Sequence, residues 1–334
     1  MTTGPVSATG PSLSTLTSQL LAAPTPGELV PPPRFAATTF DTYEIDPAIA
    51  GQGEAVATIR AFAERSTGFW RRLVSGKAKR ALYLDGDFGV GKTHLLASCF
   101  HAATGTRRYL SFAEAMSLMA LIGPKAATAH LAADLVCIDE FELDDPTNTR
   151  LADLLVGGLI EAGSRIVTTS NTVPGELGQG RMAVDLFRAQ LARLSEAFAD
   201  VHVPGHDRRL RSAAANGDPA GWGAAVAPLP AADDAFVLDA AALDRALLRV
   251  PVANLRRLAA RLRGLTVLGL APFTDQLSAL RFVHLVDRLY DHRSVMRVQS
   301  TVRVADLFPP EHCLAAFAKK YRRCQSRLRE LCAG

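Results

Sequence analysis

A glycine-rich segment between a short apolar run and a helical pattern constrains the fold of this 334-residue chain more than any other feature. It reads ALYLDGDFGVGKTHLL, in which Gly86, Gly91, Lys92 and Thr93 satisfy the spacing GxxxxGK[ST]. Glycines let backbone N–H groups approach a phosphate chain closely at the positive end of a helix. The pattern therefore predicts a P-loop within an α/β fold.

The chemistry of this loop assigns expected roles to its residues. Lys92 is expected to neutralise the β- and γ-phosphates of ATP, and Thr93 to ligate Mg²⁺ through its hydroxyl. The simpler alternative, a glycine-rich turn that only caps a helix, explains neither side chain. The predicted nucleotide-binding residues are Gly86, Asp87, Phe88, Gly89, Val90, Gly91, Lys92, Thr93 and His94.

Apolar runs alternate with helical periods between residues 40 and 203, which is typical of an α/β domain. Strands separated by helices favour a parallel sheet with right-handed crossovers. The sequence therefore predicts a P-loop NTPase domain with a five-stranded parallel sheet over residues 34–211. We expect strands at 81–85, 107–110, 135–138, 165–169 and 200–203, and helices at 92–103, 112–122, 148–161 and 182–197.

The remaining segments differ in composition. Residues 1–33 contain a single charged residue and are rich in Ser, Thr, Pro and Gly, which predicts a disordered tail. Residues 212–234 lack any period and are expected to form a linker or loop. Residues 235–334 are expected to form a mainly helical lid domain, with helices at 239–262, 277–290 and 312–331 and one short strand-like run at 295–302.

Two further strand ends carry polar residues. Asp139 and Glu140 follow an apolar strand, where open α/β sheets bind ligands. We expect Asp139 to hold Mg²⁺ and Glu140 to orient or deprotonate the attacking water, although such a pair alone is usually the start of a solvated loop. Asn171 follows the strand-like run RIVTT and is expected to sense the γ-phosphate or its water, with an Asn-Pro turn as the alternative.

Composition limits the compartment in which the protein can reside and the partners that it requires. A formal net charge of +4 neither requires nor excludes a nucleic-acid partner. Five cysteines without a CxxC pair indicate a reducing compartment without a disulfide framework or zinc site. No segment is apolar enough to span a membrane, and the N-terminus lacks the features of a secretory or mitochondrial signal. We therefore expect a cytoplasmic protein with no integral membrane segment.

The three nucleotide-site motifs indicate an AAA+ ATPase, and further motifs narrow the family. These motifs are PPPRFAATTFDTY, LYLDGDFGVGKTHLL, IDEFELDD, TTSNTVPGEL, RFVHLVDRLYDH and RRCQSRLREL. Through them the chain resembles the ZapE/AFG-type ATPases over about residues 31–331. It departs from them in having Arg208 where the family usually has tyrosine, and in a shortened lid that lacks a recognisable Leu-Cys motif.

The resemblance implies a Mg²⁺-dependent ATPase that assembles into a homo-oligomeric ring and acts on a protein partner, in bacteria the FtsZ ring of the division machinery. A ring ATPase completes each site with an arginine from a neighbouring subunit. Arg181 and Arg188 are the candidates, and a solvated helix face is an equally good interpretation of either. Within the lid, Arg281, Asp287 and Tyr290 could sense nucleotide, although a helix with a core stripe of Phe282, Leu285, Val286 and Leu289 is favoured.

Two other functions fit parts of the sequence. A nucleic-acid-associated ATP switch, such as a helicase loader, would use the basic run KKYRRCQSRLR, but a solvated helix is the commoner explanation of such a run. The absence of a helix-turn-helix pattern makes a nucleic-acid partner the weaker hypothesis. A scaffold that binds nucleotide without hydrolysis is disfavoured by the presence of Lys92, Asp139 and Glu140.

Overall fold

The computed structural model describes residues 17, 20–64, 79–87, 89–143, 146–171, 184–206, 217–232, 234–309 and 315–333. The chain divides into two compact units, Pro24–Ala214 and a second formed by Met1–Ala23 with Ala215–Gly334. We call them the P-loop unit and the C-terminal unit.

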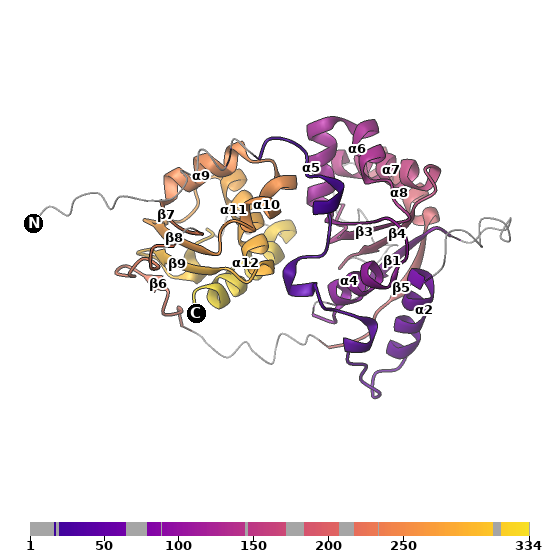
Figure 1. The fold of residues 1–334 in the computed structure, drawn as a ribbon, viewed down its shortest axis with the longest axis horizontal. Coiled ribbons are helices and arrows are strands. Elements are labelled where there is room, and N and C mark those ends of the chain that lie inside the picture. Colours follow the sequence, from indigo (N-terminus) through magenta and orange to yellow (C-terminus); the bar gives the residue numbers. More distant parts are fainter. Residues whose placement is uncertain are drawn as a thin grey trace, which may run out of the picture. The chain divides into compact units, whose positions relative to one another are not determined.

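The P-loop unit contains a five-stranded parallel sheet with the strand order β2-β3-β4-β1-β5 (Figure 1). This confirms the predicted sheet. β5 begins two residues before the predicted start, because Phe198 lies buried immediately after a helix and already pairs with β1. The strands are β1 (Ala81–Asp85), β2 (Arg107–Ser111), β3 (Leu135–Asp139), β4 (Arg165–Thr169) and β5 (Phe198–His202).

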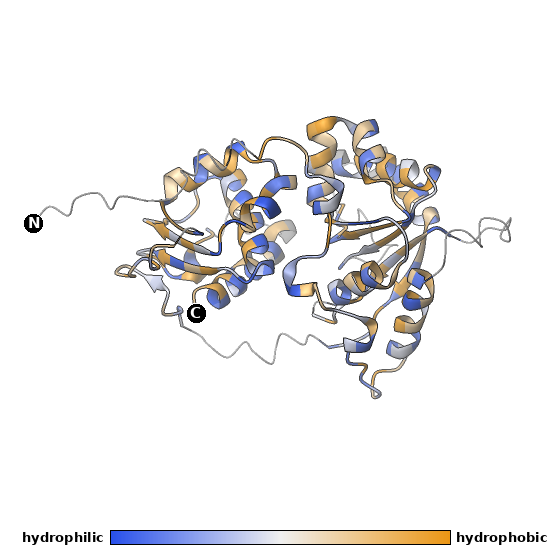
Figure 2. Ribbon diagram, viewed as in Figure 1, coloured by the Kyte–Doolittle hydropathy of each residue, from blue (hydrophilic) through white to orange (hydrophobic). Residues whose placement is uncertain are grey.

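Helices cover both faces of this sheet (Figure 1). One face carries α2 (Gln52–Glu64) and α4 (Lys92–Ala102), and the other carries α5 (Phe112–Ile122), α6 (Pro124–Leu131), α7 (Pro146–Glu161) and α8 (Val184–Ala197). Because neither face meets water, β1 and β4 are buried at every position. The helices combine hydrophobic and hydrophilic residues, as Figure 2 shows, so that they can pack on the sheet with one side.

The N-terminal segment differs from the predicted disordered tail over residues 20–33. Leu20 is fully buried in the C-terminal unit, where the Asn254 side-chain amide donates to the backbone oxygens of Leu20 (2.6 Å) and Ala22 (3.0 Å). In the P-loop unit, the Leu29 oxygen accepts a hydrogen bond of 2.8 Å from the Tyr109 N–H on β2. Composition predicts disorder, but Leu20 and Leu29 are buried, and burial of their apolar surface helps to anchor this segment.

The C-terminal unit contains a second parallel sheet, with the order β6-β9-β8-β7. Helices form most of its regular structure, as expected, but of its strands only the run at 295–302 was anticipated. Pro251 interrupts the predicted helix at 239–262, which is two helices in the structure. The elements are β6 (Trp222–Gly223), β7 (Ala235–Asp239), α9 (Ala240–Arg249), α10 (Leu255–Ala259), β8 (Gly264–Leu268), α11 (Gln276–Asp291), β9 (Val295–Gln299) and α12 (Ala315–Leu331).

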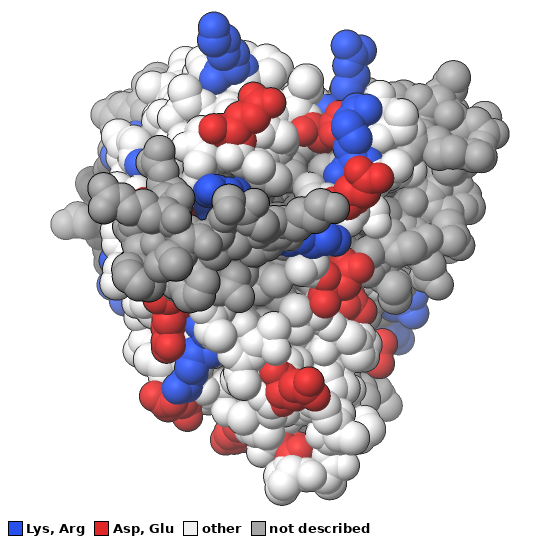
Figure 3. All heavy atoms as spheres, turned by 90° about the vertical axis from the view of Figure 1, so that its right-hand side faces the viewer, with Lys and Arg blue, Asp and Glu red and all other residues white. Residues whose placement is uncertain are grey.

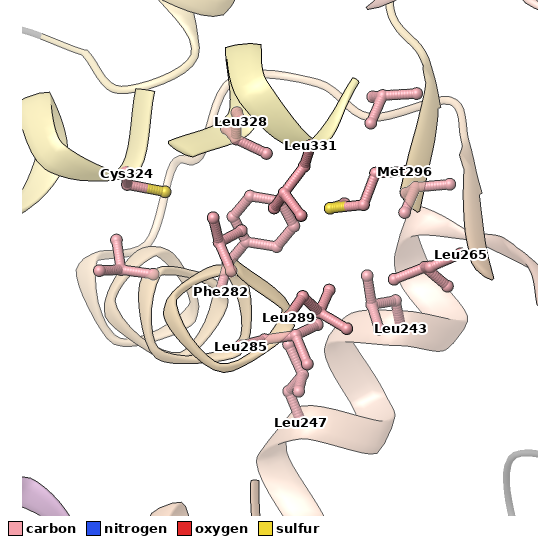
Figure 4. Packing of buried hydrophobic residues seen from close by; sticks show 14 of the residues in the cluster. Leu243, Leu247, Leu265, Phe282, Leu285, Leu289, Met296, Cys324, Leu328 and Leu331 are labelled. Carbon is pink, nitrogen blue, oxygen red and sulfur yellow. The ribbon is translucent and has the colours of Figure 1, made fainter. Parts of the chain in front are cut away.

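The core of the C-terminal unit lies between its sheet and its helices (Figure 4). Phe282, Leu285 and Leu289 of α11 point toward side chains from α9, the strands and α12. Together with Val286 they are at most 2% exposed, so the core-stripe interpretation of this helix is confirmed. The partners labelled in Figure 4 are Leu243, Leu247, Leu265, Met296, Cys324, Leu328 and Leu331.

The segment predicted as a linker at 212–234 contributes to the C-terminal unit where it is described. Trp222 belongs to β6 and donates from its indole nitrogen to the Val302 oxygen (2.8 Å). The backbone N–H of Leu229 donates to the hydroxyl of the buried Thr266 on β8 (3.0 Å). No helix in the described parts of the chain is long and apolar enough to cross a membrane.

Candidate nucleotide-binding site

The loop between β1 and α4 requires glycine for steric reasons. Gly86, Gly89 and Gly91 have φ values of 144°, 75° and 97°, which side chains rarely permit. A Cβ atom at Gly86 would lie 2.4 Å from the backbone oxygen of Val203. The three glycines therefore allow a tight turn that directs the N-terminus of α4 toward the loop, as a P-loop needs.

Lys92 begins α4 and folds over this loop. Its side chain is buried, and the Nζ atom donates to the backbone oxygens of Gly86 (2.6 Å) and Asp87 (2.8 Å). The positive charge is therefore positioned inside the loop, where a phosphate chain could meet it. Val90 is 1% exposed and contributes to the core, while Phe88 lies outside the described residues.

A segment preceding the loop in sequence stabilises it, which sequence reasoning did not assign. The Tyr43 hydroxyl donates to the Val90 oxygen (2.7 Å), and its ring lies so close to Gly91 that a Cβ there would be 2.7 Å from Tyr43 Cε2. His94 Nε2 lies 3.1 Å from the Thr42 hydroxyl and 3.0 Å from the Thr39 oxygen. His94, predicted to bind nucleotide, thus lies against residues 39–43.

Asp139 is the centre of a hydrogen-bonding network at the end of β3. The Thr93 hydroxyl lies 3.3 Å from Oδ1, which also accepts from the Thr169 hydroxyl and, at 3.1 Å, from the Glu140 N–H. The Tyr109 hydroxyl donates to Oδ2 (3.1 Å). The structure therefore brings Thr93 and Asp139 together, and it adds Thr169 and Tyr109, which the sequence analysis did not identify.

Thr93 and Asp139 fit Mg²⁺ by the chemistry of their donor atoms. Mg²⁺ prefers oxygen ligands and is usually bound by one or two carboxylates together with substrate phosphates, rather than by an all-protein cage. The described residues contain no group of three or more His, Cys, Asp or Glu side chains that could hold a metal. A hydroxyl and a carboxylate beside a P-loop leave room for phosphate ligands.

Glu140 occupies an unusual backbone conformation immediately after Asp139. Its φ is 55°, in the left-handed region that few non-glycine residues adopt. Its N–H donates to the Thr169 hydroxyl (3.0 Å), and the following N–H, of Phe141, donates to the Thr169 oxygen (2.7 Å). Thr169 and the fully buried Phe141 thus hold the turn that leaves Glu140 half-buried at the sheet edge.

Asn171 follows β4, which lies between β3 and β1 in the sheet. Its side-chain amide donates to Glu142 Oε1 (3.3 Å). This places Asn171 at the same carboxyl edge as Asp139, in contact with an acidic residue that the sequence analysis did not assign. Arg181 lies outside the described residues, and Arg188 lies in α8 without a described side chain.

Burial controls ionisation away from this edge. It raises the pKa of the Cys99 and Cys137 thiols well above the usual range, so both are neutral in the core. It also raises the pKa of the Tyr83 phenol, despite a hydrogen bond with Ser170. The cysteines therefore act as small apolar residues rather than as metal ligands.

Arg281, Asp287 and Tyr290, the predicted lid residues, bond to residues of the C-terminal unit. Arg281 Nη1 donates to the Leu247 oxygen at the end of α9 (2.6 Å), and the Tyr290 hydroxyl donates to Glu330 (2.9 Å). Asp287 is 2% exposed and forms ion pairs with Arg323 (2.7 Å) and Arg327. Burial alone would raise the pKa of Asp287, but these two guanidinium groups hold this pKa below its usual range.

Comparison with known protein families decides the assignment. The family model for AFG1-like ATPases matches residues 25–221, which is more than half of the chain and nearly all of the P-loop unit. The chain belongs to the AFG1-like ATPase family. This agrees with the resemblance inferred from the sequence motifs, and it identifies the P-loop unit as an AAA+ ATPase domain. A search of curated proteins found no match.

Solved structures resemble this AFG1-like ATPase only in part. A DNA replication initiation factor has a TM-score of 0.38 and 16% identity, with 49% of each chain covered. AMPPCP-bound DnaA from Aquifex aeolicus has a TM-score of 0.35 and 16% identity, with 51% of this chain and 50% of that chain covered. DnaI has a TM-score of 0.44 and 18% identity, with 55% and 99% covered. The chain thus spans about half the length of the first two.

Proposed function

We propose that this AFG1-like ATPase hydrolyses ATP in a Mg²⁺-dependent reaction and uses the cycle to remodel a protein partner. The observation that carries the proposal is the contact between the Thr93 hydroxyl and Asp139 (3.3 Å) beside a P-loop that already holds Lys92. A lysine, a hydroxyl and a carboxylate at the end of parallel strands are the groups that phosphoryl transfer requires.

Each residue of the site then has a chemical task. Lys92 binds the β- and γ-phosphates and neutralises their charge, while Thr93 and Asp139 hold Mg²⁺. Bound Mg²⁺ supplies positive charge to the phosphate oxygens. Glu140 orients the attacking water or accepts its proton, and Asn171 contacts the γ-phosphate or that water.

A glutamine at position 140 tests the hydrolysis step. Glu140→Gln keeps the shape of the side chain and removes its charge, so turnover should fall about 10²-fold or more while ATP still binds with Mg²⁺. The exposed Glu54 on α2 provides the matched control, because Glu54→Gln should leave turnover unchanged. An equal loss of ATP affinity and turnover in Glu140→Gln would make Glu140 a binding residue.

The proposed active form is a homo-oligomeric ring in which Arg181 or Arg188 reaches the neighbouring site. An arginine there would stabilise the charge that develops on the γ-phosphoryl oxygens. An inactive Arg181→Ala or Arg188→Ala chain should regain some activity when mixed with excess Lys92→Ala chains, which donate arginine but bind no ATP. Failure of both arginine variants to recover in mixed oligomers would contradict this assignment.

We propose a protein rather than a nucleic acid as the partner, in the cytoplasm, with the FtsZ ring of the division machinery as the candidate implied by the family resemblance. Two arginines of the basic C-terminal run, Arg323 and Arg327, pair with the buried Asp287 and so are not available to phosphates. On the face in Figure 3, basic and acidic side chains of the described residues are interspersed. This distribution favours neither DNA nor RNA.

Affinity capture tests the partner. Glu140→Gln, held in the ATP-bound state, should retain FtsZ or other division proteins, whereas Lys92→Ala should not. A salt-dependent DNA titration tests the alternative of a helicase-loader-like switch. DNA binding that strengthens with ATP and weakens steeply with salt, without any captured protein, would favour that alternative.

A further inference from the structure

We propose that Tyr109 is a positioning residue for Asp139, which fixes the orientation of this carboxylate for Mg²⁺ binding. The inference rests on the proposed function, because it concerns the same metal site. Tyr109 lies on β2, is 2% exposed, and donates from its hydroxyl to Asp139 Oδ2 (3.1 Å).

The register of the sheet explains how Tyr109 reaches this carboxylate. In the parallel pair β2 and β3, Tyr109 lies opposite Cys137 and Ser111 opposite Asp139. Residues two apart on a strand share a face, so Tyr109 and Asp139 project from the same side of the sheet. The length of a tyrosine side chain matches the distance of two residues along a strand, about 6.6 Å.

The two oxygens of Asp139 have different partners. Oδ1 accepts from Thr93, Thr169 and the Glu140 N–H, whereas Oδ2 accepts from Tyr109. The terminal torsion of an aspartate rotates through a broad range unless both oxygens are held. The Tyr109 hydroxyl therefore limits that rotation and keeps Oδ1 facing Thr93.

The position of Tyr109 is itself well defined. Its backbone N–H donates to the Leu29 oxygen (2.8 Å), and its ring meets the edge of Phe100 on α4 with centroids 6.3 Å apart. The strand is thus held between β3 and the N-terminal segment. A hydroxyl in so buried a position can stabilise a carboxylate strongly, because hydrogen bonds to charged groups exceed neutral ones in strength.

The test compares nucleotide binding with and without Mg²⁺ in Tyr109→Phe. Phenylalanine keeps the ring contacts and removes only the hydroxyl. In EDTA, the affinity of Tyr109→Phe for a fluorescent ATP analogue should match that of the wild type. The Mg²⁺ concentration that gives half of the Mg²⁺-dependent change in this affinity should rise about 10-fold, as for other residues that orient metal ligands. Mn²⁺ binding to the protein with ADP, followed by electron paramagnetic resonance, should weaken by the same factor.

Tyr290→Phe provides the matched control, because the Tyr290 hydroxyl bonds Glu330 in the C-terminal unit and should leave Mg²⁺ dependence unchanged. The positioning role would be overturned if Tyr109→Phe left the half-maximal Mg²⁺ concentration unchanged, or if it lowered nucleotide affinity equally with Mg²⁺ and in EDTA. Neither result would affect the proposed function. A wild-type protein without Mg²⁺-dependent ATP turnover would instead overturn the proposed function.

Discussion

The two units both contain a parallel sheet covered by helices, yet they use polar residues differently. In the P-loop unit, polar side chains gather at the carboxyl ends of the strands, where Thr93, Asp139 and Thr169 bond one another. In the C-terminal unit, a buried polar cluster lies between α11 and α12, where Asp287 pairs with Arg323 and Arg327. A parallel sheet therefore does not by itself make a ligand site.

Under the proposed function, this difference separates residues that would contact nucleotide and metal from residues that stabilise the fold. The carboxylate of Asp139 is half-buried beside the P-loop, whereas that of Asp287 is enclosed by its own unit. We therefore expect substitutions in the two clusters to have separable effects, on nucleotide binding and on the stability of the C-terminal unit, respectively.

The largest effect on stability is expected from Asp287→Ala. It leaves two half-buried arginines without their buried carboxylate, so the C-terminal unit should lose about 3–5 kcal/mol of unfolding free energy. In a Trp70→Phe background, fluorescence of the buried Trp222 would report this unfolding in denaturant. The exposed pair Arg303–Asp306 (3.7 Å) provides the control, since Asp306→Ala should cost less than about 1 kcal/mol.

The ion pairs of Asp287 with Arg323 and Arg327 should also respond to acid. Because the pKa of Asp287 is lowered by folding, its stabilisation is complete above the pKa of an unfolded aspartate, ~3.9, and is lost as the pH falls below it. The stability difference between wild type and Asp287→Ala should therefore shrink below about pH 4. A constant difference down to pH 2 would show that charge is not the source of the effect.

A smaller loss is expected when the N-terminal anchor is removed. Leu20 is fully buried in the C-terminal unit, so Leu20→Ala should lower its unfolding free energy by about 2–4 kcal/mol. Leu21, adjacent in sequence, is 53% exposed, and Leu21→Ala should have almost no effect. Equal melting curves for the two variants would show that the Leu20 side chain does not anchor residues 20–23.

The smallest effect concerns the hydrogen bond between Tyr43 and the P-loop residue Val90. Tyr43→Phe removes the hydrogen bond to the Val90 oxygen and should weaken ATP binding by about 5-fold, the equivalent of ~1 kcal/mol. A nucleotide titration measures this directly, with Tyr290→Phe in the other unit as control. If affinity is unchanged, Tyr43 contributes packing but does not set the conformation of the loop.

Local patterns made much of the P-loop unit predictable. Glycine spacing, apolar strands and polar strand ends are short-range signals, and the parallel sheet brings the ends of β3 and β4 to one edge. The same reasoning did not reach Tyr43 or Tyr109. Each acts on a residue far away in sequence, Val90 and Asp139 respectively, and nothing in the local pattern distinguishes it from an ordinary core tyrosine.

The C-terminal unit was less predictable for a related reason. β7 and β8 are five-residue strands just before and just after the predicted helix at 239–262, and their short apolar runs were assigned to no element because such runs carry little periodic signal. The helix α11 was recognised because its core stripe extends over several turns. Leu20 was not placed, because the segment was interpreted by its Ser-, Thr-, Pro- and Gly-rich composition, although Leu13, Leu16 and Leu20 have the i, i+3, i+7 spacing of a helix face.

Calorimetric titration with ATP and Mg²⁺ tests most directly whether the P-loop binds the nucleotide through Lys92. Lys92→Ala should lose affinity by about 100-fold or more, since the charge inside the loop is removed. Lys125→Ala, at an exposed position on α6, should bind as the wild type does. Unchanged ATP binding by a folded Lys92→Ala protein would contradict the claim.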